Sequence, residues 1–213
     1  MEKYDLLPRQ LMHEGTCTPE DFFTPTALDR ATIERIHHSE YIDKLLALDL
    51  DKKEARKIGF PLSKQLIDRE IIIAGGTIQG ALKALEHGIA MNIAGGTHHA
   101  FKAHGEAFCL FNDQAIAAQY LLDQELVDTI LIVDLDVHQG NGTAEIFESN
   151  SKVFTFSMHG EKNYPFHKEK SDLDIALEDG CSDEVFLNIL EETLPKLIAQ
   201  NQPDFIFYLC GVD

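Results

Sequence analysis

Short apolar runs alternate along this chain with longer amphipathic stretches. The clearest run, residues 130–133, has four apolar residues in a row, three of them β-branched, which is typical of a buried parallel strand. Similar runs predict further strands at residues 89–94, 152–157 and 204–209. The amphipathic stretches predict helices at about residues 26–37, 40–50, 63–86, 112–124 and 183–200.

Strands that alternate with helices in this way predict an α/β fold with a doubly wound, mostly parallel sheet flanked by helices. The sequence has no internal repeat, low-complexity stretch or linker, so we expect a single domain over residues 1–213. His37 and His38 lie in a predicted helical region beside a charged face. We interpret both as structural or surface residues rather than ligands.

The composition narrows the classes of partner. The 18 Lys and Arg residues and 36 Asp and Glu residues give a formal net charge of −18, which argues against direct binding of nucleic acid and only weakly steers a basic substrate. No apolar run is long enough to cross a membrane, and residues 1–5 do not resemble the start of a signal peptide. The four scattered cysteines form no C-x-x-C pair, which favours a reducing cytoplasm.

Polar side chains follow the central apolar run at once. In an open α/β sheet, ligands bind in the crevice outside the carboxyl ends of the strands. Asp134, Asp136 and His138 stand at alternate positions, so all three can lean to one side of an extended segment. Carboxylate and imidazole groups suit a divalent metal such as zinc. A lone Asp-x-Asp is more often a solvated strand end, but the histidine and the Gly-Asn-Gly that follow favour a site.

Two adjacent imidazoles, His98 and His99, follow a pair of glycines after the predicted strand at 89–94. One histidine is most often a satisfied structural residue, whereas two in tandem after a glycine turn favour acid–base chemistry. Parallel strands would bring these histidines to the same edge as the polar residues after 130–133 and as Asp213, which follows the last apolar run. The sequence therefore predicts a metal site with a general base beside it.

Four motifs in this order resemble those of the zinc-dependent histone deacetylase superfamily, which includes bacterial acetoin-utilisation-type proteins and acetylpolyamine amidohydrolases. They are Gly-Gly-Thr-His-His at 95–99, Ala-Phe-Cys-Leu-Phe-Asn-Asp at 107–113, Asp-Leu-Asp-Val-His-Gln-Gly-Asn-Gly-Thr at 134–143 and Gly-Val-Asp at 211–213. The resemblance covers nearly the whole chain and is closest to the class IV-like bacterial branch. It implies an arginase/deacetylase-like fold and a hydrolase that removes acetyl from N-acetyl-lysine of a protein or from a related acetylated amine.

The resemblance also implies roles for the matching polar residues. Asp136, His138 and Asp213 would hold zinc, which would polarise the acetyl carbonyl and lower the pKa of a water molecule. His99 would be the general base and then protonate the leaving amine, while His98 would stabilise the developing oxyanion.

Further implied roles concern the surroundings of these groups. Asp134 would hold His98 through its ring N–H, and Asn141 would face His99. The family also binds a potassium ion, for which the matching positions are Asp134, Asp136, His138, Ser157 and Met158.

Aromatic residues would form the slot for the aliphatic stem of the substrate. From the residues alone, Phe108 is equally well a core residue or a slot wall. By the resemblance it would be one wall, with Tyr164 or Phe166 opposite, and Ala107 stands where many members have glycine.

The chain departs from the family pattern in two further respects. Asn141 stands where many members have Asp. The family's catalytic tyrosine lies in a Gly-rich segment downstream of the third ligand, whereas the chain ends at Asp213, and neither Tyr164 nor Tyr208 has that context. We therefore expect a domain that is incomplete at its N- and C-terminal ends and is by itself weak or inactive.

Two other functions remain open at this stage. One is a deacylase for acetylpolyamines or other small molecules. The other is a non-catalytic module that binds acetyl-lysine or a metal. Arginase-like manganese hydrolases share the architecture, but they need more carboxylates for a second metal than these motifs supply.

Overall fold

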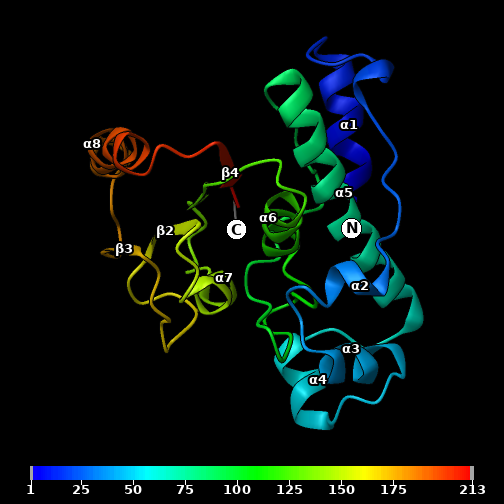
Figure 1. Ribbon diagram of the computed structural model, residues 1–213. Coiled ribbons are helices and arrows are strands. Elements are labelled where there is room, and N and C mark those ends of the chain that lie inside the picture. The colour runs from blue at the N-terminus through cyan, green and yellow to red at the C-terminus, as the bar shows by residue number, and fades with distance from the viewer. Residues whose placement is uncertain (1, 212–213) are drawn as a thin grey trace.

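The computed structural model of the chain describes residues 2–211. Its N-terminal half is helical, and a parallel sheet with its covering helices follows (Figure 1). The helical half contains α1 (Lys3–His13), a 3-10 turn η1 (Pro19–Asp21), α2 (Arg30–Ile33), α3 (Ser39–Leu46), α4 (Lys52–Ile58), α5 (Lys64–His87) and α6 (Asp113–Asp123). The remainder contains β1 (Ile130–Asp134), α7 (Asn141–Phe147), β2 (Val153–Gly160), β3 (Leu173–Leu177), α8 (Asp183–Asn201) and β4 (Phe205–Leu209).

The strands of the described residues form one sheet in the order β3-β2-β1-β4, and all neighbouring strands are parallel. Ile130 at the start of β1 lies opposite Val153 on one side and Phe205 on the other. The prediction of a parallel α/β sheet flanked by helices is therefore confirmed. Because all strands run the same way, their carboxyl ends meet at one edge, where the polar residues after β1 begin.

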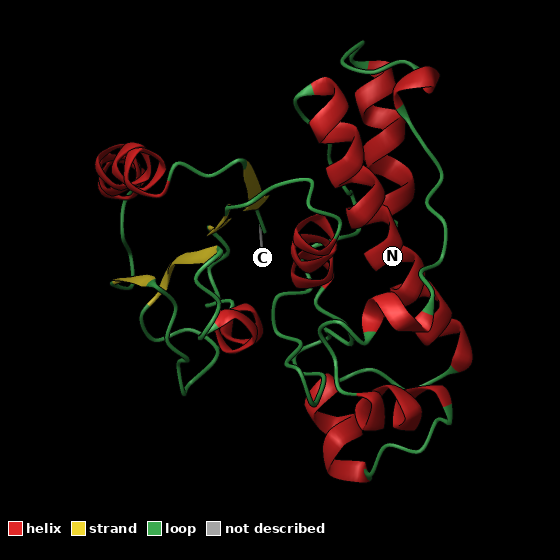
Figure 2. Ribbon diagram, viewed as in Figure 1, coloured by secondary structure: helices red, strands yellow, loops and turns green. Residues whose placement is uncertain are grey.

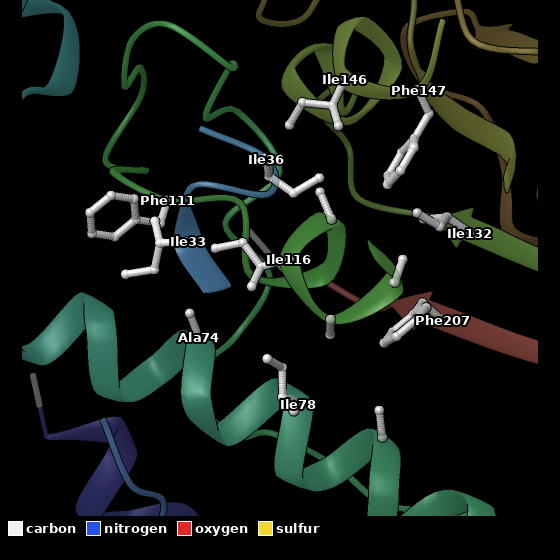
Figure 3. Packing of buried hydrophobic residues seen from close by; sticks show 14 of the residues in the cluster. Ile33, Ile36, Ala74, Ile78, Phe111, Ile116, Ile132, Ile146, Phe147 and Phe207 are labelled. Atoms are coloured by element: carbon white, nitrogen blue, oxygen red, sulfur yellow. The ribbon is translucent and has the colours of Figure 1, made fainter. Parts of the chain in front are cut away.

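Helices cover both faces of the central strand (Figure 2). Ile130 and Ile132 belong to the larger apolar core, which α5 and α6 complete; Figure 3 shows α6 lying between α5 and the strands. Leu131 and Val133 point to the opposite face, where they pack with Leu197 of α8. Burial on both faces explains why β1 is an uninterrupted apolar run in the sequence.

Polar residues at the helix starts explain where several of these helices begin. The side chains of Ser63, Asn112 and Ser182 accept backbone N–H groups in the first turns of α5, α6 and α8. The starts of these three helices agree with the predictions. The helix expected at 26–37 is shorter, since Asp29 caps the four-residue α2 and residues 22–29 have no regular secondary structure.

Two strand predictions differ from the structure. Residues 89–94 form no strand but a turn-containing segment in which Ile89 is 82% and Met91 69% exposed. Among the described residues no strand pairs with this segment, so its apolar character alone does not give it strand geometry. Conversely, no strand was expected between residues 157 and 204, yet β3 forms there, and Asp174 and Ala176 alternate in it with half-buried neighbours. None of the helices within residues 2–211 is both long and apolar enough to cross a bilayer.

Candidate functional site

The chain turns after the carboxyl end of β1, and the acidic side chains of this segment accept backbone N–H groups from within it. The backbone N–H of Asp136 donates to Asp134 Oδ1 at 3.0 Å, and the backbone N–H of His138 donates to Asp136 Oδ1 at 2.8 Å. Each carboxylate thus fixes the residue two positions further on. As a result, the side chains of Asp136 and His138 meet, with 3.1 Å between Asp136 Oδ1 and His138 Nδ1.

A buried carboxylate on α6 holds the loop that carries the two tandem histidines. Asp113 Oδ1 accepts the backbone N–H of Thr97 at 2.8 Å and that of Gly96 at 3.1 Å, while its Oδ2 accepts the hydroxyl of Thr77 at 2.6 Å. Asp113 is 1% exposed, so these contacts lie in a region that excludes water. The histidines therefore follow a loop that is tied to α5 and α6, rather than the end of a strand as expected.

His98 and Asp134 form a buried pair. The ring nitrogen His98 Nδ1 lies 2.6 Å from Asp134 Oδ2, and both side chains are about 5% exposed. Burial by itself lowers the pKa of His98, but the negative charge of Asp134 and its hydrogen bond outweigh burial, so this pKa is raised. The structure thus shows the contact that was expected between these two residues, and it favours a charged imidazole at position 98.

His99 has the opposite electrostatic character. Burial, followed by the neighbouring imidazole of His98 at 4.1 Å between ring centroids, lowers the pKa of His99 to about 3. Its Nδ1 lies 2.7 Å from Asn141 Oδ1. Since an amide oxygen can only accept, Nδ1 carries the proton and Nε2 keeps a lone pair. His99 is consequently a neutral imidazole with a basic nitrogen directed away from Asn141.

The described residues supply two of the three predicted zinc ligands, Asp136 and His138. The third, Asp213, lies outside the described residues, and within 2–211 no group of three His, Cys, Asp or Glu side chains could hold a metal. One carboxylate and one imidazole in contact are a suitable pair of donors for zinc. Moreover, a Cβ atom at Gly211 would lie 1.7 Å from Asp136 Oδ2, so the chain after β4 passes directly beside this carboxylate. The donors present therefore fit a zinc ion.

The positions matched to a potassium site lie on adjacent strands. Ser157 and Asp134 are partners in the parallel register of β2 and β1, and Met158 follows on β2. Ser157 Oγ lies 2.9 Å from Nδ1 of the buried His159. Asp136 and His138 belong to the loop that continues β1, so the five predicted positions gather at one end of the strand pair.

The predicted slot residues differ in their surroundings. Phe108 is 59% exposed, contacts Phe60 at 4.9 Å between ring centroids and, like Ala107, has a positive φ, +67° and +44° respectively. Tyr164 lies edge-on to His99 at 5.0 Å between centroids, whereas Phe166 is 85% exposed. Of the two alternatives, Tyr164 is therefore the aromatic residue that contacts the histidine pair.

Sequence reasoning did not single out Glu106, which contacts several of these groups. Its carboxylate accepts the hydroxyl of Tyr164 and, at 3.4 Å, the side-chain N–H of Asn141. Hydrogen bonds from His104 and Tyr164 hold the pKa of Glu106 near 2 against the opposing effect of burial, and Lys57 lowers it further. The sequence signal that could have pointed to Glu106 was its position directly before the Ala-Phe-Cys motif.

The loop that carries Tyr164 is itself held by a cation. The ammonium group of Lys168 donates to the backbone carbonyls of Asn163 and Pro165, both at 2.7 Å, and of Glu161 at 3.3 Å. Gln139, next to the predicted ligand His138, exchanges hydrogen bonds with the backbone of Glu169. The loop that carries Tyr164 and the loop that carries His138 are thereby tied together.

Comparisons with known sequences and structures all lead to the same protein family. A family model described as "Histone deacetylase domain" matches residues 1–213. An uncharacterized protein of Picosynechococcus is 46% identical over 213 residues, which is 100% of this chain and 71% of that protein. Histone deacetylase clr6 of Schizosaccharomyces pombe is 31% identical over 89% of this chain and 52% of its own length.

The solved structure of an HDAC homolog from Aquifex aeolicus has a TM-score of 0.81 and 25% identity, covering 95% of this chain and 60% of that one. The chain thus spans 52–71% of the length of these relatives. Because the family model matches the whole chain and the fold agrees with that of the HDAC homolog, the chain belongs to the histone deacetylase family.

Proposed function

We propose that this protein is a zinc-dependent deacetylase that removes the acetyl group from N-acetyl-lysine of a protein or from a related acetylated amine. The observation that carries the proposal is the pair of unlike histidines beside two metal donors. His99 Nδ1 faces the amide oxygen of Asn141 and burial lowers the pKa of His99, whereas His98 Nδ1 faces Asp134 and the pKa of His98 is raised; Asp136 and His138 lie adjacent.

Each of these residues has a distinct task in amide hydrolysis. His99 Nε2 takes the proton of the attacking water and later delivers it to the leaving amine, which restores the neutral imidazole. The positive charge of His98 stabilises the negative charge that develops on the acetyl oxygen. Asp136, His138 and Asp213 would hold zinc, which when bound supplies a Lewis acid for the acetyl carbonyl.

Further features support an extended, acetylated amine as substrate. Phe108 and Tyr164 offer aromatic faces on which an aliphatic stem can pack, and the net charge of −18 is compatible with a basic substrate. We assign potassium to the end of β1 and β2 and the loop after β1, at Asp134, Asp136, His138, Ser157 and Met158. The four cysteines are free thiols, and on that basis we assign the protein to the cytoplasm.

The test combines metal content with turnover on the full-length protein. We expect about one zinc per chain and hydrolysis of an acetyl-lysine peptide, and we expect His138→Ala to lose both. The matched control is His87→Ala, because His87 lies at the exposed end of α5, where its imidazole faces the side chain of Glu86.

Other outcomes would replace the proposal. Hydrolysis of acetylpolyamines alone would indicate a small-molecule deacylase. Binding of an acetyl-lysine peptide without turnover would indicate a non-catalytic module. Full zinc occupancy in His138→Ala would contradict the ligand assignment.

A further inference from the structure

We propose that Glu106 is a positioning residue, which fixes the aromatic wall of the slot and the partner of the general base through one carboxylate oxygen. This inference rests on the proposed function, since it concerns the same site. None of the motifs that define the site assigns a role to the Glu106 side chain. Its hydrogen bonds nevertheless connect Tyr164 of the predicted slot with Asn141, the partner of His99.

The two oxygens of Glu106 face different surroundings. Oε1 accepts the hydroxyl of Tyr164 and the side-chain N–H of Asn141, the latter at 3.4 Å. Oε2 faces outward, with Lys57 Nζ at 3.4 Å and His104 Nε2 at 3.5 Å. One oxygen is therefore directed into the site, and the other holds the carboxylate from outside.

The inward contacts reach the base by two routes. Through Asn141, Glu106 fixes the amide whose oxygen lies 2.7 Å from His99 Nδ1, and this contact determines which nitrogen of His99 is basic. Through Tyr164, it fixes a ring that stands at 88° to the imidazole of His99. A phenylalanine would supply the same ring, so the hydroxyl serves the contact with Glu106.

The local fold does not depend on the Glu106 side chain. The backbone N–H of Glu106 donates to the carbonyl of Cys109 at 3.0 Å, and the backbone N–H of Cys109 returns a bond at 2.9 Å. Its neighbour Ala107 donates its backbone N–H to the carbonyl of Lys57. Substitutions at Glu106 leave these backbone bonds in place, so effects on the site can be separated from effects on the loop.

The experiment uses the full-length, zinc-loaded protein with an acetyl-lysine peptide, four single variants and one double variant. In Glu106→Gln the amide oxygen can take the place of Oε1, so we expect kcat and KM close to those of the unsubstituted protein. In Glu106→Ala both inward bonds are lost, and we expect kcat to fall and KM to rise, each by about 10-fold. Lys57→Met removes only an outer contact and is the matched control, with an expected change under about 3-fold.

The fourth variant, Tyr164→Phe, tests the coupling. We expect it to raise KM in the unsubstituted protein but not in the Glu106→Ala background, because the partner of the hydroxyl is already absent there. Independent, additive effects would overturn the inference. So would unchanged kinetics in Glu106→Ala, or a loss in Glu106→Gln as large as that in Glu106→Ala.

An independent readout separates this inference from the proposed function. The imidazole C–H signals of His99 in proton NMR spectra of the zinc-free protein report the position of the Tyr164 ring and need no turnover. We expect Glu106→Ala to shift them and Glu106→Gln and Lys57→Met to leave them in place. If the unsubstituted protein shows no turnover, the proposed function fails, and these signals alone decide for or against the role of Glu106.

Discussion

The buried side chain of His37 makes the stability of the protein depend on pH in a predictable direction. His37 is 1% exposed, its Nδ1 lies 2.9 Å from the carbonyl of Phe101, and its Nε2 accepts the backbone N–H of Asn112 at 3.0 Å. Because Nε2 must accept, a second proton there would break the bond to Asn112. Burial lowers the pKa of His37 to about 4, and the neighbouring His38 lowers it as well.

The size and sign of the effect follow from this pKa. An unfolded chain protonates His37 near pH 6.5, whereas the folded protein does so near pH 4. Between these values the unfolded state binds a proton that the folded state does not, so the free energy of unfolding falls as the pH falls. At about 1.4 kcal/mol per pKa unit, the full loss is about 3 kcal/mol.

Glu70 acts in the opposite direction over nearly the same pH range. It lies on α5 with 3% exposure, and burial raises its pKa to about 7 from 4.5, with Asp113 adding to the rise and Arg69 opposing it. Here the folded state holds the extra proton between pH 4.5 and 7. The free energy of unfolding therefore falls by about 3 kcal/mol as the pH rises through this range.

The two contributions nearly cancel in the unsubstituted protein, so single variants reveal them. We expect His37→Gln, whose amide can both donate to Phe101 and accept from Asn112, to become less stable as the pH rises from 4.5 to 7. Glu70→Gln should become more stable over the same range. Urea unfolding followed by circular dichroism at closely spaced pH values measures both slopes. Parallel curves for the two variants would refute the reasoning, because all other titrating groups are common to both.

Three further outcomes follow from the site. Asp134→Ala should retain most of its zinc but lose about 10–100-fold in turnover, because the partner of His98 is removed; unchanged turnover would contradict this role. Gly142→Ala should cost about 1–3 kcal/mol in thermal unfolding, since its Cβ would lie 2.3 Å from the carbonyl oxygen of Ala100. Ala107→Gly should stabilise the protein by about 1 kcal/mol, because φ is +44° at that position; an unchanged or lower melting temperature would contradict this.

Sequence patterns predicted those parts of the fold that depend on local signals. The run at β1 is apolar because both of its faces are buried, and the start of α5 is marked by Ser63, whose hydroxyl accepts a backbone N–H. The apolar residues 89–94 carry a similar signal, yet Ile89 and Met91 remain exposed. A strand requires a neighbour at hydrogen-bonding distance, and no periodicity within six residues reports whether one is present.

In the candidate site, too, the sequence predicted local contacts but not contacts between residues far apart in the chain. Alternation placed Asp134, Asp136 and His138 together because their contacts are local, each two residues apart. The role of Glu106 could not be found in this way, because its contacts with Asn141 and Tyr164 span 35 and 58 residues. Only the folded arrangement brings that carboxylate to Asn141 and Tyr164.

The parallel pairing of β1 with β4 has a consequence for synthesis on the ribosome. The carboxylate of Asp204, just before β4, accepts the backbone N–H of Thr129, just before β1, across 75 residues of chain. At about 5–20 residues per second, translation of that interval takes on the order of 4–15 s. During this time one edge of β1 has no β4 to pair with, and Gly211 has not yet reached Asp136. The nascent chain is then most exposed to mispairing and to capture by chaperones, and the segment around Gly211 reaches Asp136 only after β4 has been made.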